Sequence, residues 1–435
     1  MTGAVAANGL REAACLIPGA LARGGNRLAA LAWPPRSAYL HIPFCHRRCF
    51  YCDFPVVPLG DRASAEAGAP GSASIAHYLQ QLHREIAAAP AGPPLSTVYV
   101  GGGTPSLLSA EQLQALLGAL RRRFGLAPGA EVSLELDPAS FDQQRLAGYL
   151  AAGVTRVSLG GQSFSDAVLE QLGRRHRRAD LLEAASWLRQ AQANGRLQSW
   201  SLDLIQGLPG QDLSVWREQL QHAIALQPPH LSVYDLIVEP GTVFERLEQR
   251  GGLALPENDL AADLMELTAH TLAAAGYGHY EISNYALPGH ASRHNRVYWS
   301  GAGWWGFGMG ATAAPWGLRE ARPRTREGYA AWLEQNEAAR RQADLQPPPE
   351  EVAGMPLDER WMVGLRRREG VLLQAPQGLL RRWQPFMEQG LLRQEGPRWR
   401  LTDPEGLALS NAVLRELLGW WEEEGSALAD PPPSP

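Results

Sequence analysis

Residues 38–52 read AYLHIPFCHRRCFYC, a short apolar run followed at once by Cys45, Cys49 and Cys52. The run at 39–42 predicts a strand, with the cysteines in the loop after it. Thiolates are soft ligands, and three in one loop select an iron–sulfur cluster over hard metal ions. They can hold three irons of a [4Fe-4S] cubane and leave the fourth iron open to a small chelating molecule. This stretch therefore predicts a metal centre directly after the first strand.

A structural zinc site is the alternative, because zinc takes four protein ligands and His41 or His46 could complete a Cys₃His set. The spacing argues against zinc, since structural zinc sites usually pair their cysteines two by two. The fourth cysteine, Cys15, lies far upstream, and we expect it to be dispensable. Four cysteines in 435 residues do not make a disulfide framework, so the sequence predicts a reducing compartment and a cytoplasmic protein.

From residue 38 onward, short apolar runs alternate with helical stretches. This alternation predicts an α/β fold with a parallel sheet, and six such units suggest an incomplete (β/α)6 barrel. Parallel sheets bind ligands at the carboxyl ends of their strands, so the chemistry is expected in the loops that follow them. The expected strands are 39–42, 97–100, 132–136, 155–159, 200–205 and 231–234, and the expected helices are 75–89, 110–124, 142–152, 179–193 and 213–226.

Composition shifts divide the chain into five expected segments. A Pro-rich stretch near 346–351 predicts a linker, and helices with a short strand pair after it resemble a winged-helix domain. The segments are a flexible N-terminal extension (1–36), the partial barrel (37–315), a helical connection and linker (316–350), a small C-terminal helical, winged-helix-like domain (351–428) and a disordered tail (429–435).

Charge and hydropathy exclude two classes of function. The net charge is -5, and within 357–425 ten arginines are matched by eleven acidic residues, so no basic surface for nucleic acid is expected. No apolar run reaches the roughly 18 residues that a membrane span requires. We therefore expect a soluble protein, with the C-terminal domain serving packing rather than transcription.

Polar and glycine residues follow several of the expected strands. Gly101, Gly102 and Gly103 let the backbone approach a ligand closely, although the lysine of a phosphate-binding loop is missing. Glu135 and Asp137 point to one face because strand side chains alternate, and Asp137 could also cap the next helix. Taken alone, the three glycines favour a plain tight turn, although they follow a strand at the edge where a parallel sheet binds ligands.

The motifs together resemble radical S-adenosylmethionine (SAM) proteins, and within them the HemN/HemW group, which contains oxygen-independent coproporphyrinogen III oxidases and heme chaperones. The resemblance covers about 38–315 and continues more weakly beyond. It rests on YLHIPFC (39–45), GGGTP (101–105), GQSF (161–164), LDLIQGLP (202–209) and HNRVYW (294–299).

The resemblance implies a [4Fe-4S] cluster on Cys45, Cys49 and Cys52, with SAM chelating the open iron. His176 beside these motifs is expected to be a solvated helix residue, and Asp137 stands where we expect Asn in the chaperone branch. The residues that match cofactor contacts of the family are Tyr39, Gly102, Gly103, Thr104, Glu135, Gln162, Arg174 and Asp203.

An aromatic run follows HNRVYW, with Trp304 and Trp305 flanked by glycines. Residues alone favour a core that seals the open side of the barrel, whereas the resemblance implies that exposed aromatic faces bind heme. His294 is then the expected axial ligand, with His279 and His290 as rivals.

The residue after Cys52-Asp53 separates the two branches. The oxidases carry CxxxCxxCxC, whereas this chain has Phe54 at the additional cysteine position. The resemblance therefore implies a heme chaperone that passes heme to apo-hemoproteins, and the alternative is a SAM-dependent coproporphyrinogen III oxidase. The expected partners are heme or porphyrin and apo-hemoprotein recipients, with transient membrane association and without nucleic acid.

Overall fold

The computed structural model describes residues 34–317, 319–343 and 355–425. Nearly all of the expected N-terminal extension, the Pro-rich linker and the expected tail lie outside these ranges, and so does Cys15. Domain boundaries predicted at those places therefore stay predictions.

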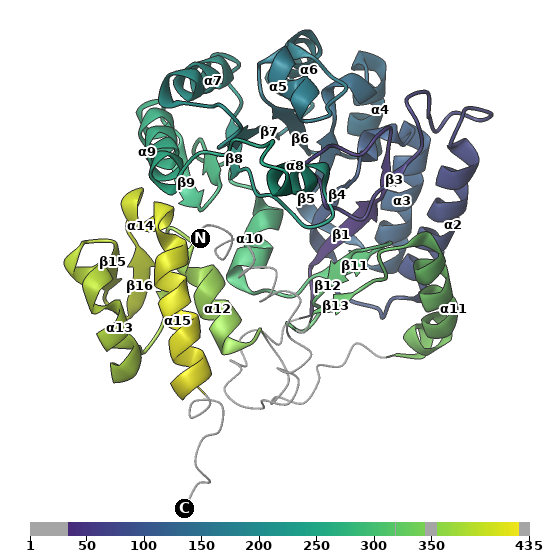
Figure 1. Cartoon of the computed structure of the whole chain (residues 1–435). Coiled ribbons are helices and arrows are strands. Elements are labelled where there is room, and N and C mark those ends of the chain that lie inside the picture. The colour runs from purple at the N-terminus through teal and green to yellow at the C-terminus, as the bar shows by residue number, and fades with distance from the viewer. Residues whose placement is uncertain (1–33, 318, 344–354, 426–435) are drawn as a thin grey trace, which may run out of the picture.

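A nine-stranded sheet forms the centre of the molecule (Figure 1). All six predicted strands are present and run parallel to one another, which confirms the α/β fold with an open, mostly parallel sheet. They are β1 (Ser37–Ile42), β4 (Leu95–Gly102), β5 (Leu126–Leu136), β6 (Arg156–Gln162), β7 (Ser199–Gln206) and β8 (His230–Asp235), in that order across the sheet.

Helices between these strands cover the outer face of the sheet (Figure 1). The five predicted helices are confirmed with small shifts at their ends, and their starts follow ordinary capping chemistry: Ser109 forms a capping box with Gln112, and Asp142 and Asp212 accept bonds from first-turn N–H groups. The helices between the strands are α2 (Ser72–Ala88), α3 (Ala110–Arg123), α4 (Gln143–Ala152), α5 (Asp166–Gln171), α6 (Arg178–Ala193) and α7 (Leu213–Ala225). Two more helices, α8 (Val243–Gln249) and α9 (Asn258–Ala274), follow β8.

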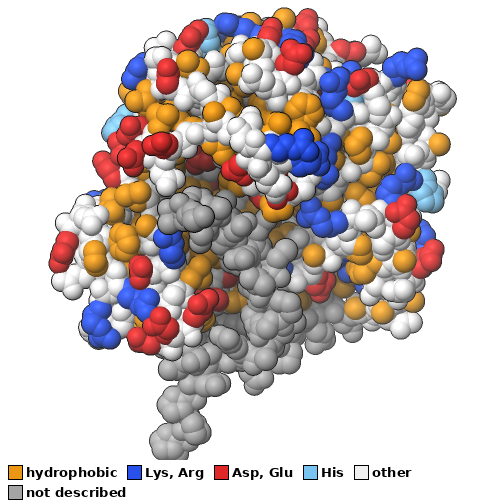
Figure 2. Space-filling model, in the orientation of Figure 1, with side chains coloured by type: hydrophobic (Ala, Val, Ile, Leu, Met, Phe, Trp, Pro, Cys, Tyr) orange, Lys and Arg blue, Asp and Glu red, His pale blue; other side chains and the backbone are white. Residues whose placement is uncertain are grey.

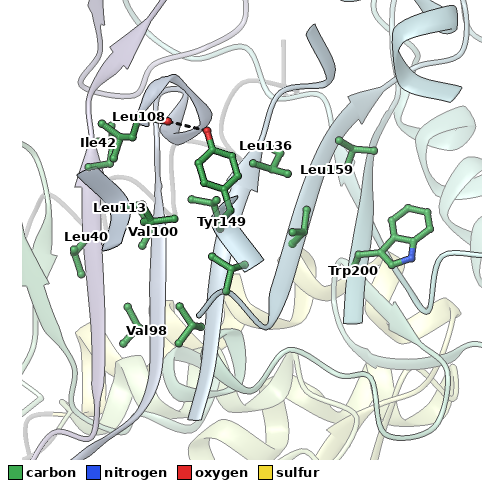
Figure 3. Close-up of a cluster of buried hydrophobic side chains, with 14 of the residues drawn as sticks. Leu40, Ile42, Val98, Val100, Leu108, Leu113, Leu136, Tyr149, Leu159 and Trp200 are labelled. Atoms are coloured by element: carbon green, nitrogen blue, oxygen red, sulfur yellow. Dashed lines mark hydrogen bonds between the residues drawn. The ribbon is translucent and has the colours of Figure 1, made fainter. Parts of the chain in front are cut away.

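The main hydrophobic core lies between the sheet and these helices (Figure 3). Leu40 and Val100 on neighbouring strands are fully buried, and burial of each such side chain stabilises the fold by about 1.5–3 kcal/mol. Tyr149 on α4 ends in this core, where its hydroxyl donates to the backbone oxygens of Leu108 at 2.8 Å and Ser106 at 2.9 Å. The core thereby fixes the loop that follows the triple glycine.

The aromatic run contributes a strand that the sequence pattern did not predict. Strand β11 (Trp305–Phe307) pairs in parallel with β1. Trp305 packs on Phe124 with 5.6 Å between ring centroids, and Trp304, Trp305 and Phe307 are buried. The expectation of exposed aromatic faces here is therefore wrong, because the glycines bring backbones close together instead: a Cβ at Gly306 would lie 2.3 Å from the oxygen of Thr312.

The opposite edge of the sheet is antiparallel. Strand β10 (Asn284–Ala286) pairs with β8 and with β9 (Gly278–Glu281). The other small elements around the barrel are β2 (Phe44–Cys45), β3 (Val57–Pro58), η3 (Pro105–Leu107), η4 (Pro138–Ser140), α10 (Arg293–Ser300), β12 (Thr312–Ala313), β13 (Glu320–Ala321) and α11 (Arg326–Gln342).

The C-terminal domain has a hydrophobic core of its own, centred on Trp383, Leu365 and Leu417. Its helix–strand–helix–hairpin order agrees with the winged-helix-like expectation. It contacts the barrel through an Arg296–Glu369 ion pair at 2.5 Å. The elements are α12 (Leu357–Leu365), β14 (Val371–Leu372), α13 (Gln377–Glu388), β15 (Leu392–Glu395), β16 (Arg398–Leu401), α14 (Glu405–Ala408) and α15 (Ser410–Glu424).

None of the helices in the described ranges has the length and apolarity needed to cross a membrane.

Candidate functional site

A cavity of about 450 Å³ opens at the carboxyl ends of the parallel strands. It brings together residues that are distant in the sequence, from Cys45 to Glu239. Tyr39 and His294 are not among its lining residues. The predicted residues that line it are Cys45, Cys49, Cys52, Gly102, Gly103, Thr104, Glu135, Gln162, Arg174 and Asp203.

The cysteine loop is held in place by backbone pairing. Strand β2 pairs in parallel with β3, and the N–H of Leu59 donates to the oxygen of Cys45 at 2.8 Å. Further along, Cys52 N–H donates to the oxygen of Cys49 at 3.2 Å. Burial raises the pKa of Cys45 to about 12 and also raises that of Cys52, because a bare thiolate is poorly solvated there. The ionised thiols therefore need a positively charged partner inside the cavity.

The residues around the thiols fit an iron–sulfur cluster. A Cβ at Gly103 would lie 2.8 Å from Cys45 Sγ, so only glycine leaves the sulfur free at this point. Both ring nitrogens of His41 already have partners, since Nδ1 bonds the Tyr39 hydroxyl at 2.9 Å and Nε2 bonds the oxygen of Pro55 at 3.0 Å. His41 is therefore not available as the fourth ligand of a zinc site. Within 34–317, 319–343 and 355–425, no group of three His, Cys, Asp or Glu side chains, the three cysteines included, is arranged to hold one metal ion. A [4Fe-4S] cluster differs from such a site, because each cysteine sulfur binds a different iron.

Glu135 lies deeper in the cavity, at the end of β5. Its Oε2 accepts the Gly102 N–H and its Oε1 accepts the Tyr99 hydroxyl, both at 2.9 Å. Burial raises the pKa of Glu135 to about 7, although these two bonds oppose the shift. Glu135 lines the cavity, where a carboxylate can accept hydrogen bonds from the hydroxyls of a ribose.

Asp203 and Gln162 come from the next two strands. Asp203 accepts the hydroxyls of Ser158 at 2.7 Å and Ser201 at 3.2 Å, while burial raises its pKa. Gln162 has φ +63°, a conformation that non-glycine residues rarely adopt, and it coincides with a register shift between β6 and β7. Such irregularities redirect side chains next to functional sites, and here Gln162 lines the cavity.

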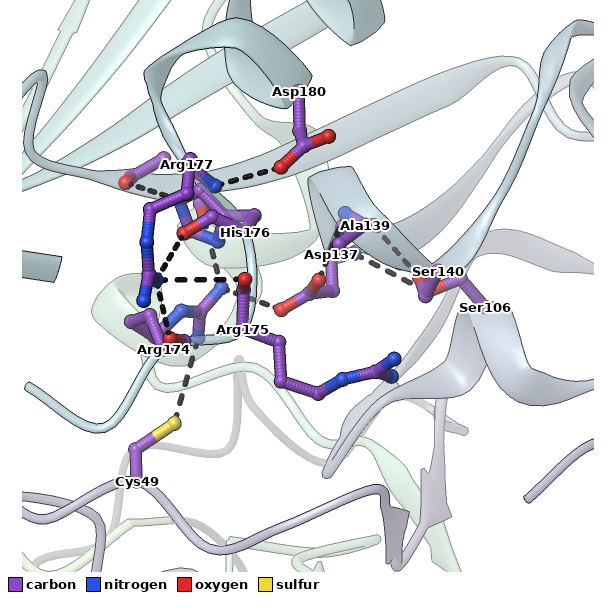
Figure 4. A network of polar contacts seen from close by, with 12 residues as sticks. Cys49, Ser106, Asp137, Ala139, Ser140, Arg174, Arg175, His176, Arg177 and Asp180 are labelled. Atoms are coloured by element: carbon purple, nitrogen blue, oxygen red, sulfur yellow. Dashed lines mark hydrogen bonds and ion pairs between the residues drawn. The ribbon is translucent and has the colours of Figure 1, made fainter. Parts of the chain in front are cut away.

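Arg174 links the cysteine loop to the sheet (Figure 4). One of its Nη atoms donates to Asp137 Oδ2 and to the oxygen of Gly160, both at 2.8 Å, and the other lies 3.8 Å from Cys49 Sγ. Burial by itself raises the pKa of Asp137, but the Arg174 guanidinium lowers it below the usual value. Asp137 also lines the cavity, and it caps η4 by accepting the Ala139 N–H at 3.0 Å, which is the capping role considered from the sequence.

Two predictions about histidines need correction. His176 is fully buried rather than solvated, and its Nε2 bonds the oxygen of Gly161 at 3.0 Å. His294 is also fully buried: Nδ1 lies 2.8 Å from Thr97 Oγ1, and Nε2 lies 2.8 Å from the Tyr298 hydroxyl. With both ring nitrogens hydrogen-bonded, His294 does not present the accessible imidazole that an axial heme ligand needs.

The rival histidines differ from each other. His279 bonds Asp403 at 2.7 Å through Nδ1 and the oxygen of Ile282 at 3.3 Å through Nε2. His290 is half-buried and bonds Ser199 Oγ at 3.0 Å through Nδ1.

Sequence reasoning missed Tyr99, which lines the cavity and orients Glu135. Its signal was the alternation along β4, because Thr97, Tyr99 and Gly101 share one face of the strand.

Comparisons with known proteins agree with this geometry. Residues 39–221 match the Radical SAM superfamily. The heme chaperone HemW of Synechocystis is 41% identical over 417 residues, covering 90% of this chain and 98% of that protein. HemW of Escherichia coli is 40% identical over 279 residues, covering 64% of this chain and 70% of that protein.

Among solved structures, the radical SAM enzyme coproporphyrinogen III oxidase (HemN) from Escherichia coli shares the fold, with a TM-score of 0.70. The match covers 92% of this chain and 95% of the oxidase, at 22% identity. Near-complete coverage at about 40% identity, together with the cysteine loop and the cavity behind it, decides the family. The chain belongs to the HemW family of radical SAM proteins.

Proposed function

We propose that this protein is a heme chaperone, which binds heme and transfers it to apo-hemoproteins while holding a [4Fe-4S] cluster and SAM. The observation that carries the proposal is Phe54. It occupies the additional cysteine position of the oxidase motif, and it lies at the cavity with half of its side chain exposed. Similarity to heme chaperones along nearly the whole chain supports the same function.

Different residues of the cavity would bind the two cofactors. Cys45, Cys49 and Cys52 would hold the cluster, which supplies an open iron and electrons when bound. Glycines 102 and 103 admit a ligand close to the backbone. Glu135 and Asp203 would accept hydrogen bonds from the ribose of SAM, and Arg174 keeps a positive charge beside Cys49.

The second candidate is coproporphyrinogen III oxidation, in which SAM-derived radical chemistry leads to decarboxylation of propionate side chains. Asp137 favours it, because this residue agrees with the oxidase branch and forms an ion pair with Arg174.

One experiment separates the two functions. The anaerobically reconstituted chain is first loaded with heme and mixed with apo-myoglobin, and it is then incubated with reductant, SAM and coproporphyrinogen III. We expect heme to move to the recipient and no protoporphyrinogen IX to form. Formation of protoporphyrinogen IX in amounts that exceed the protein would move the chain to the oxidase function.

We also propose a cytoplasmic location and transient association with membranes. Cell fractionation and flotation with anionic vesicles test this, with recovery in the soluble fraction and weak, salt-sensitive flotation as the expected result. Stable flotation at high salt would contradict transient association.

A further inference from the structure

Large hydrophobic side chains are exposed around the mouth of the cofactor cavity. Phe54, Tyr234 and Ile237 line the cavity and are 50%, 42% and 40% exposed. Phe50, also exposed, packs against Gly173 of the same cavity. These four residues, the apolar rim, account for four of the nine large hydrophobic side chains exposed in the described ranges. Such clustering marks binding surfaces on soluble proteins.

The apolar rim rests on a rigid base. A separate hydrophobic cluster of Leu172, Ile205, Leu208 and Phe244, with Tyr51 and Leu236 packed against it, adjoins the rim. The Phe50 N–H donates to the oxygen of Leu172 at 3.0 Å, and Tyr234 pairs with Ile205 in the sheet. Backbone bonds tie the segments together, since Phe50 O accepts the Phe244 N–H at 3.1 Å and Gln206 O accepts the Leu236 N–H at 2.9 Å. The rim residues are therefore exposed although the loops that carry them are fixed.

The charges at the mouth are divided between its loops. Arg47 and Arg48 belong to the cysteine loop, and Arg175 follows Arg174. Asp61 forms ion pairs with both Arg47, at 3.2 Å, and Arg175, at 3.6 Å. Arg48 forms no ion pair within the described residues and donates to the oxygen of Phe54 at 2.8 Å.

The loop after β8 carries the acidic residues Asp235 and Glu239 on the cavity wall. The side with the cysteine loop is therefore basic on balance, because Arg47, Arg48 and Arg175 outnumber Asp53 and Asp61, and the opposite side is acidic. Figure 2 shows hydrophobic and basic side chains next to each other on the face that carries α8.

We infer that heme docks on the apolar rim, with its macrocycle against Phe54, Tyr234 and Ile237 and its propionates toward Arg48 and Arg175. The inference rests on the proposed function and names its binding surface. Heme combines a flat apolar face with two carboxylates on one edge, which matches an apolar surface with arginines on one side only. A cavity of about 450 Å³ lies near the lower end of the range for a single small ligand, so with SAM in the interior heme would lie at the mouth, against the lining residues that are exposed.

The test measures heme affinity of the reconstituted full chain from the Soret band. The variants are Phe54→Ala with Ile237→Ala, and Arg48→Glu. Leu182→Ala is the matched control, because Leu182 is a similarly exposed apolar residue on α6, away from the cavity. Cluster absorbance and SAM affinity verify that each variant is folded.

We expect the double variant to bind heme about tenfold more weakly, which corresponds to about 1.4 kcal/mol, and the control to bind it as the unmodified protein does. Arg48→Glu should weaken binding of heme but leave binding of its dimethyl ester, which lacks the carboxylates, unchanged.

Unchanged heme affinity in folded rim variants overturns the docking site while leaving the chaperone function intact. Unchanged affinity with impaired transfer to apo-myoglobin also overturns it and makes the rim a protein-docking surface. Failure of the unmodified protein to bind heme is a different result, since it overturns the proposed function itself.

Discussion

The ring of Tyr99 stacks on the ring of His294, with 5.2 Å between the centroids and 28° between the planes. The Tyr99 hydroxyl on the other side donates to Glu135 at 2.9 Å. His294 is fixed in turn by its bonds to Thr97 and Tyr298. The first residue of the HNRVYW motif therefore supports, from behind, a carboxylate of the cofactor cavity.

His294→Ala is expected to weaken SAM binding several-fold and to leave heme affinity within about twofold, because Tyr99 loses its stacking partner while the apolar rim is untouched. Calorimetric SAM titration and Soret titration measure the two effects. Tyr99→Phe is the companion variant, since it keeps the stack but removes the bond to Glu135, and it should also weaken SAM binding. Loss of heme binding with normal SAM binding in His294→Ala would restore the histidine as a heme ligand.

Replacement of Cys45, Cys49 and Cys52 by serine should abolish the cluster, because a serine hydroxyl is a hard and weakly acidic ligand for iron. The measurements are iron content and the brown absorbance after anaerobic reconstitution. Cys15→Ser is the control and should keep about four irons per chain. Four irons bound to the triple variant would disprove the assignment of the cluster.

SAM affinity should rise with pH around neutrality. Burial raises the pKa of Glu135 to about 7, and only the ionised carboxylate accepts hydrogen bonds through both oxygens. Protonation below pH 7 therefore removes acceptors, so binding weakens as the pH falls from about 8 to about 6. Calorimetry across this range measures the slope, and Glu135→Gln should flatten it. If SAM affinity of Glu135→Gln depends on pH as steeply as that of the unmodified protein, a group other than Glu135 is responsible for the pH dependence.

The raised pKa of Glu135 should also make the stability of the cofactor-free protein depend on pH. A carboxyl whose pKa is raised by folding contributes stability that is complete below its unfolded pKa and is lost as the pH rises through about 7. Denaturant titrations at pH 5 and pH 8 measure the unfolding free energy of the cofactor-free chain. We expect this free energy to fall more between the two pH values in the unmodified protein than in Glu135→Gln. An equal pH dependence in the two proteins contradicts this origin.

Arg174→Ala should lower the free energy of unfolding by about 2 kcal/mol, because Asp137 then stays buried without its charged partner. Urea denaturation of the cofactor-free chain measures the loss. Arg174→Lys keeps the charge but not the planar fork that reaches both Asp137 and Gly160, so we expect an intermediate value. Equal stability of Arg174→Ala and the unmodified chain would show that the ion pair contributes nothing.

Local patterns were sufficient for much of the fold. The six parallel strands and five helices follow from apolar runs and their punctuation, since each needs only neighbouring residues to be recognised. Strand β11 escaped this reasoning because it is three residues long and is defined by its pairing with β1, which lies more than 260 residues earlier.

The sequence by itself determined the cysteine loop, the placement of Glu135, Gln162 and Asp203 in or after the parallel strands, and the family, because the donor atoms and their spacing can be recognised without knowing the fold. Only the tertiary structure decided which polar residues act together. Arg174 contacts Asp137 and Cys49 because the loops that carry these three residues come together in the fold. His294 is buried and stacks on Tyr99, whereas the sequence had predicted an exposed ligand. Burial and hydrogen-bond partners depend on elements that are distant in sequence. A histidine that a motif predicts to be a ligand, such as His294, can therefore hold a neighbouring side chain in place in the folded protein.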